Sequence, residues 1–158
     1  MTTLLDLSRH VDVIESLRHE IGKQVSEAGW TGWNRTNIQN LRLLDSVIKE
    51  SMRDGNRDPV VYDKPDEWDG FRYYKMRQAG DKEDMAQLAC ATVEHAGFGV
   101  GKHSCPGRFY ASDLIKIILC HILMKYDWKV VDNGSPETVV VAWTQMVHPD
   151  VKILFKRR

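Results

Sequence analysis

The sequence predicts a mainly α-helical fold with a small antiparallel β hairpin near its C-terminal end. Segments 11–27 and 37–53 repeat apolar residues at intervals of three and four, which is the pattern of amphipathic helices. A third segment, 107–126, is apolar on most of its sides and predicts a long buried helix. Two runs rich in valine and other strand-forming residues, 138–146 and 151–155, predict the two strands of the hairpin.

Length and charge exclude several classes of protein. The 158 residues are enough for one compact domain with its own core, so we expect 1–158 to form a single domain. With 22 basic and 22 acidic residues the net charge is zero, which argues against nucleic acid as a partner. No apolar run approaches the roughly 20 residues that span a bilayer, and the N-terminus lacks the pattern of a secretory signal. We therefore expect no transmembrane segment and a cytoplasmic location.

The N-terminal half contains the two amphipathic helices. The first is defined by apolar residues spaced three and four apart, with charges between them, and the loop 29–33 follows it. The second carries Leu41, Leu44 and Met52 on one face, and the turn 54–56 should end it, since glycine accepts the left-handed conformation. The stretch 57–90 is mostly polar and is expected to be a loop.

The C-terminal half is expected to hold the long helix and the hairpin. The helix is apolar on more than one side, which implies burial on more than one side. A turn is expected at 132–136. The segments 138–146 and 151–155 should then pair through His148-Pro149-Asp150.

Cys105 is the residue most suited to chemistry. It lies in a glycine-rich loop, Phe98–Arg108, directly before the long helix. A thiolate needs nearby positive charge or amide donors, and Lys102 and His103 supply cations while the glycines let the backbone approach closely. This arrangement indicates a metal-binding thiolate, and its alternative is a free surface cysteine. The other two cysteines are most simply small core residues, because three are too few for a disulfide scaffold.

The loop resembles the haem-binding loop of cytochromes P450, whose pattern is Phe-x-x-Gly-x-(His/Arg)-x-Cys-x-Gly. All fixed positions match, at Phe98, Gly101, His103, Cys105 and Gly107. The resemblance implies a haem (iron protoporphyrin) whose iron takes the Cys105 thiolate as axial ligand. It also implies that Phe98 packs on the thiolate side of the haem, that Gly101 permits the tight turn and that His103 hydrogen-bonds a propionate.

A second resemblance concerns Glu50 and Arg53. Three residues apart on one helix, they share a face and can pair, and an exposed pair contributes only about 0.2–0.5 kcal/mol. The helix resembles the K helix of fungal cytochromes P450, with its Glu-x-x-Arg motif. Residues 65–72 resemble the segment whose arginine completes a Glu-Arg-Arg cluster, so Arg72 would be the third member. The implied role is structural, and no catalytic residue is assigned.

The resemblance covers nearly the whole chain but only the C-terminal third of the family's fold. The distal helix with an acid–alcohol pair, which delivers protons to bound oxygen, has no counterpart, and neither has the family's membrane anchor. The strands that should follow the Glu-x-x-Arg helix are also missing, which indicates an internal deletion near 54–57. We expect a truncated protein that leaves one haem face open to water.

Three functions remain open. The first is a truncated haem-thiolate oxidoreductase of monooxygenase lineage, from fungal secondary metabolism. Its expected partners are an NADPH-dependent reductase or a chain that supplies the missing distal half, and, if it is active, a small hydrophobic substrate. The second is a haem-free isomerase or cyclase, for which the available polar groups are His95, His103, His121, His148 and Asp113. The third is a non-catalytic, partner-dependent protein. An absorption spectrum with and without haemin separates the first from the other two.

Overall fold

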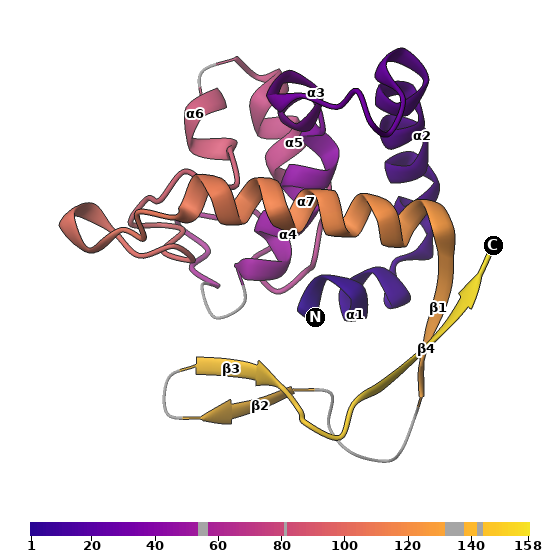
Figure 1. The fold of residues 1–158 in the computed structure, drawn as a ribbon. Coiled ribbons are helices and arrows are strands. Elements are labelled where there is room, and N and C mark those ends of the chain that lie inside the picture. The colour runs from indigo at the N-terminus through magenta and orange to yellow at the C-terminus, as the bar shows by residue number, and fades with distance from the viewer. Residues whose placement is uncertain (54–56, 81, 132–137, 142–143) are drawn as a thin grey trace.

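The fold, seen in a computed structural model, is mainly helical with two small antiparallel sheets (Figure 1). Residues 1–53, 57–80, 82–131, 138–141 and 144–158 are described. Their elements are α1 (Thr2–Arg9), α2 (Val11–Ala28), α3 (Arg35–Gln39), α4 (Arg42–Met52), α5 (Arg72–Gln78), α6 (Glu83–Ala86), a 3₁₀ turn (Gly101–His103), α7 (Arg108–Lys125), β1 (Tyr126–Val131), β2 (Thr138–Val141), β3 (Thr144–Val147) and β4 (Lys152–Arg157). This architecture confirms the predicted fold class.

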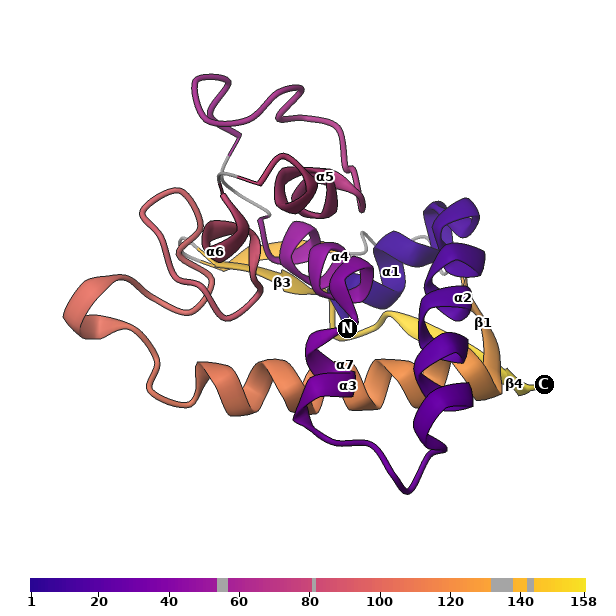
Figure 2. The same cartoon turned by 90° about the horizontal axis from the view of Figure 1, so that it is seen from above.

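Helix α7 spans the whole width of the helical cluster, and α4 lies behind it (Figures 1 and 2). The core joins α1, α2, α4 and α7, and its fully buried side chains include Leu7, Leu17, Ile21, Leu44, Val47 and Leu123. The predicted helices 11–27 and 107–126 are confirmed as α2 and α7. Apolar burial on facing helices is therefore the main stabilising contribution, at about 25 cal/mol per Å² of apolar surface.

The predicted helix 37–53 is wrong as a single element, because the chain forms α3 and α4 instead. Asn34 caps α3, and its side chain accepts hydrogen bonds from the amides of Thr36 and Asn37. Leu41, with ψ 67°, then leaves the helical conformation and buries its side chain completely. Burial of this one leucine is a tertiary effect that the periodic pattern does not contain.

The first turn of α4 is capped by a residue from another helix. The Glu20 carboxylate accepts hydrogen bonds from the amides of Leu43 (2.7 Å) and Leu44 (3.0 Å). Burial raises the pKa of Glu20, and these amide hydrogen bonds only partly oppose the shift. Glu20 thus satisfies two of the amides that every helix leaves unpaired at its start, and it ties α2 to α4.

Two further predictions about helices need correction. The stretch 57–90 is not only loop, since it contains the short helices α5 and α6. Residues 2–9 form α1, for which no helix was expected, and Leu5 and Leu7 of α1 are buried in the core. These helices have four to eight residues, too few for a periodic pattern to distinguish them from a loop.

The predicted hairpin pairs the wrong segments. The run 138–146 is not one strand, because β2 pairs with β3 within it, and β4 pairs with β1 rather than with its neighbour in sequence. In that second ladder Trp128 lies opposite Phe155. Strand β1 follows α7 without a loop, so its alternation of aromatic and charged residues was hidden at the end of the helix. The predicted turns 54–56 and 132–136, and most of the expected deletion near 54–57, lie outside the described residues.

Removal of the Glu20 carboxylate should weaken the start of α4. We expect Glu20→Ala to lower the free energy of unfolding by about 1–2 kcal/mol, as losing a helix cap does, measured by urea denaturation followed by circular dichroism. The control is Glu15→Ala on the same helix, whose side chain is 78% exposed and should cost under about 0.5 kcal/mol. Equal effects of the two variants would contradict the capping role.

Candidate functional site

The loop that carries Cys105 is closed by one backbone hydrogen bond. The amide of Cys105 donates to the carbonyl of Phe98 at 2.7 Å. Between these two residues the backbone turns through Gly99 and Gly101, at φ 75° and 58°, a conformation that favours glycine. A Cβ at Gly99 would lie only 2.6 Å from the His103 carbonyl oxygen. The turn therefore requires glycine at position 99 for both conformation and space.

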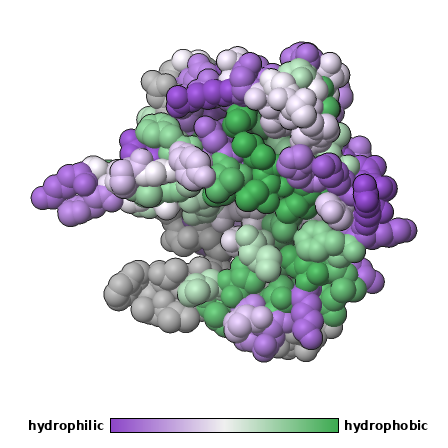
Figure 3. Space-filling model, in the orientation of Figure 1, coloured by the Kyte–Doolittle hydropathy of each residue, from purple (hydrophilic) through white to green (hydrophobic). Residues whose placement is uncertain are grey.

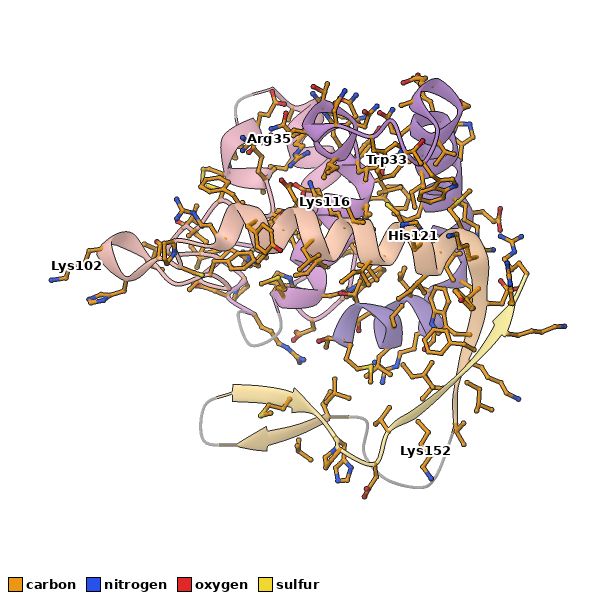
Figure 4. The ribbon with its side chains drawn as sticks, in the orientation of Figure 1. Trp33, Arg35, Lys102, Lys116, His121 and Lys152 are labelled. Atoms are coloured by element: carbon orange, nitrogen blue, oxygen red, sulfur yellow. The ribbon has the colours of Figure 1, made fainter. Side chains whose placement is uncertain are left out.

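The turn presents the sulfur to the outside. Cys105 is a free thiol and is exposed, as are Lys102 and His103, and Lys102 extends from the tip of the loop (Figure 4). Phe98 is half-buried and packs against the core. The Arg108 guanidinium donates to the Cys105 carbonyl at 3.1 Å and lies over the ring of Phe109.

The geometry around the sulfur fits an axial thiolate ligand. A Cβ built on Gly107 would lie 3.9 Å from the Cys105 sulfur, an ordinary van der Waals distance, so Gly107 lies directly beside the sulfur. His103, two residues before the cysteine, is exposed on the same loop and free to reach an anionic group. One wall of a haem site can thus be built from Phe98, His103, Cys105 and Gly107.

The structure brings Glu50, Arg53 and Arg72 into one buried ion cluster. The Arg53 guanidinium donates to both Glu50 carboxylate oxygens, at 2.9 and 3.0 Å. The Arg72 Nε donates to the same two oxygens at 3.1 and 3.2 Å. The Glu50 side chain is fully buried. The pairing with Glu50 raises the pKa of Arg53 although burial opposes it.

The cluster also organises the polar segment that follows α4. Arg53 donates to the carbonyls of Pro65 and Glu67. Arg72 donates to the carbonyls of Asp63, Lys64 and Glu67. The ring of Tyr62 lies 5.2 Å from the Arg53 guanidinium, within cation–π range. The two arginines therefore fix the backbone of 63–67, which has no regular secondary structure of its own.

Lys49, which sequence reasoning missed, fixes the next stretch in the same way. Its ammonium donates to the carbonyls of Met85, Gln87 and Cys90, at 2.8–3.2 Å. The residue is completely buried, and this burial lowers the pKa of Lys49 to about 8. Nothing in the sequence distinguishes Lys49 from the surface lysines, since only the fold determines which face of α4 is covered.

The polar residues considered for haem-free chemistry contact different neighbours. His95 meets the edge of the Tyr73 ring, His121 stacks on Trp30 and the His148 Nδ1 lies 3.8 Å from Asp150. Burial lowers the pKa of His95 to about 3, and no described residue hydrogen-bonds its Nε2. Of these three contacts, only that of His148 with Asp150 joins two ionisable groups, and it lies within the short connection between β3 and β4.

The family model for cytochrome P450 matches residues 55–157. The fold and the cysteine loop therefore have the family's pattern, and the chain belongs to the cytochrome P450 family. The chain is 35% identical over 190 residues to cytochrome P450 monooxygenase hepE of Aspergillus oryzae. It is 36% identical to cytochrome P450 monooygenase 1 of Gibberella fujikuroi over the same length.

The chain spans less than half the length of these relatives. The alignments cover 98% of this chain but 34% of the Aspergillus protein and 42% of the Gibberella protein. The solved structure of retinoic acid bound cyanobacterial CYP120A1 superposes with a TM-score of 0.71 at 16% identity, over 99% of this chain and 41% of that chain. This last likeness supports the fold alone. Among the described residues, no helix is long and apolar enough to cross a membrane.

Neutralising the centre of the ion cluster should be costly. We expect Glu50→Gln to lower the free energy of unfolding by about 3–5 kcal/mol, because it leaves two buried guanidinium groups without their carboxylate. The measurement is urea denaturation at neutral pH. The matched control is Glu67→Gln, the same chemical change at a side chain that is 66% exposed, with an expected loss below about 0.5 kcal/mol. A loss for Glu50→Gln as small as the control's would contradict a stabilising cluster.

His95 should make the protein sensitive to acid. Its pKa is about 3 in the folded state against 6.5 for a free histidine, so below pH 6.5 the unfolded chain takes up a proton that the folded chain refuses. Stability should therefore fall between pH 6.5 and 3, by up to about 1.4 kcal/mol per pH unit from this residue.

The pH dependence is tested by unfolding at several pH values. We expect His95→Gln to flatten the pH slope in that range by about one proton. His19→Gln, at an exposed position, should leave the slope unchanged. Parallel slopes for all three proteins would refute the assignment to His95.

Proposed function

We propose that this chain is the proximal, haem-thiolate portion of a fungal cytochrome P450 monooxygenase of secondary metabolism, with Cys105 as the axial ligand of the haem iron. Membership of the family implies a haem cofactor. The observation that supports Cys105 is its free, exposed sulfur at the end of a glycine turn that the Phe98 carbonyl closes.

Each residue of the loop would have a defined part in holding the haem. Phe98 would support the cysteine side of the ring from the core, and Gly101 permits the turn. His103 would donate to a propionate, and Gly107 lies beside the sulfur. When bound, the haem supplies oxygen-activating chemistry, which a thiolate ligand favours by pushing electron density toward the iron. Glu50, Arg53 and Arg72 would act as scaffold for these proximal loops.

An uncovered apolar face supports a requirement for a second chain. Tyr110, Leu114 and Ile118 lie four residues apart on α7 and are 42–76% exposed. The space-filling view shows apolar surface along α7 (Figure 3). Apolar patches of this kind mark sites of interaction. We propose that a chain carrying the distal half covers this face, completes the haem pocket and admits a small hydrophobic substrate, with an NADPH-dependent reductase as electron donor.

The alignment lengths support the internal deletion near 54–57. Since 98% of 158 residues is about 155, an alignment of 190 positions contains about 35 positions at which this chain has a gap. The family match also begins at residue 55, directly at the proposed junction. We infer that a segment of roughly that length follows the Glu-x-x-Arg helix in the relatives and is missing here.

The exposed face also supports one alternative, a non-catalytic protein that functions only with a partner. Such a protein keeps the scaffold cluster but has no need of the Cys105 sulfur. The two functions therefore differ in haem binding.

Haem binding is tested by titrating the purified chain with haemin. We expect a thiolate-type Soret band, and a thiolate-type difference spectrum after reduction and addition of carbon monoxide. Both should be lost in Cys105→Ser and kept in Cys90→Ser, the control at the half-buried cysteine. A spectrum that is identical in wild type and Cys105→Ser would refute the ligand and favour the non-catalytic alternative.

A further inference from the structure

A cleft of 290 Å³ lies between α3, α4 and the first half of α7. Its walls carry Arg35 of α3, Arg42 of α4, Arg77 of α5 and Lys116 of α7. Figure 4 shows Arg35 and Lys116 on the same side of the helical cluster, with Lys116 on α7. The cleft does not include the Cys105 loop, so a ligand in the cleft would bind independently of haem.

The floor of the cleft contains more buried positive than negative charge. Asp45 pairs with Lys116 at 3.0 Å and with Arg77, and the side chains of all three are 6–7% exposed. One carboxylate thus faces two cations. The nearby carboxylate of Glu20 is already occupied, because both its oxygens accept hydrogen bonds from the amides at the start of α4. Burying a cation without a matching anion costs free energy. Because Arg77 and Lys116 share the one carboxylate of Asp45, a further negative group would stabilise this cluster.

Two arginines that line the cleft have bonding capacity that the described residues do not use. The Nε of Arg77 is buried, and no described residue accepts its hydrogen bond. Arg35 is exposed and forms no ion pair with any residue in the described part of the chain. The buried Ser112 lines the same cleft and brings a hydroxyl. The lining of the cleft thus contains these two arginines and a hydroxyl group, which are donors that suit an oxyanion.

We propose that this cleft binds a phosphate group, held by Arg35 and Arg77 and screened by Lys116 from the repulsion of Asp45. A dianionic group would neutralise the buried excess of positive charge that Arg77 and Lys116 leave beside the single carboxylate of Asp45. Arginine suits this role, because its planar fork matches the geometry of phosphate oxygens.

Two further acidic residues line the cleft, and they differ in whether they are paired. Glu83 is already paired with Arg42 at 3.4 Å. Asp113 lines the cleft and forms no ion pair among the described residues, so it opposes an incoming anion. Neutralising Asp113 should therefore strengthen binding, whereas neutralising Arg35 should weaken it. A purely structural role of these two exposed or half-buried side chains would give no such opposite pair of effects.

The experiment is equilibrium dialysis of the full chain with radiolabelled inorganic phosphate at constant ionic strength. We expect one saturable site, binding about tenfold weaker in Arg35→Gln, as for the loss of a charge-assisted contact. Asp113→Asn should bind more tightly. The control Lys102→Gln removes a charge from the exposed loop tip and should bind as the wild type does.

A second arm uses phenyl phosphate in competition with the labelled phosphate. Tighter binding than inorganic phosphate would assign the site to a phosphate ester, since Phe109 also lines the cleft, and equal or weaker binding would assign it to the free ion. Binding that is absent, that does not saturate, or that is equal in wild type, Arg35→Gln and Asp113→Asn would overturn the proposal. Circular dichroism of each variant confirms that it is folded.

Discussion

The carboxylate of Glu50, fully buried between two guanidinium groups, is the interaction on which the rest of the proximal structure depends. Burying a charge is costly, and the cost is offset only when all its hydrogen-bonding positions are occupied. Arg53 and Arg72 occupy them, and the amide of Asp69 adds a further hydrogen bond at 3.1 Å. The arginines in turn hold backbone carbonyls of the segment 63–67. A chain segment with no regular structure is thereby fixed against α4.

Three buried charged residues along α4, namely Asp45, Lys49 and Glu50, connect the helix to later segments of the chain. Asp45 binds the side chains of Arg77 and Lys116 and accepts from the amide of Leu88, while Lys49 binds three carbonyls between 85 and 90. With Glu50, these residues connect one buried helix to most of the chain between 63 and 90. The buried charged residues of α4 thus hold the parts of this stretch that lie outside α5 and α6 and have no backbone ladder of their own. Buried polar networks favour a unique arrangement when their members have hydrogen-bond partners. Glu50 and Lys49 each have several such partners here.

The cysteine loop follows in sequence the segments that the charged residues of α4 hold. The last of the carbonyls that Lys49 binds belongs to Cys90. Phe98 follows eight residues later, packs on the core and closes the Cys105 turn with its carbonyl. In the haem site proposed above, this chain would supply the sulfur side. The relatives are more than twice as long, and the exposed apolar face of α7 indicates where additional structure would pack. The ion cluster and the cysteine loop lie in the same part of the family's sequence, which this chain contains.

The sequence by itself determined the long helices, the family and the positions of Cys105, Glu50, Arg53 and Arg72, because apolar periodicity and fixed motif spacing are local properties of a chain. It did not determine the break at Leu41, the pairing of β1 with β4, or the burial of Lys49 and His95. Only the tertiary structure decided these features. A strand's partner and a side chain's surroundings depend on residues tens of positions away, and the free energy of burying a leucine or a lysine is set by those distant residues.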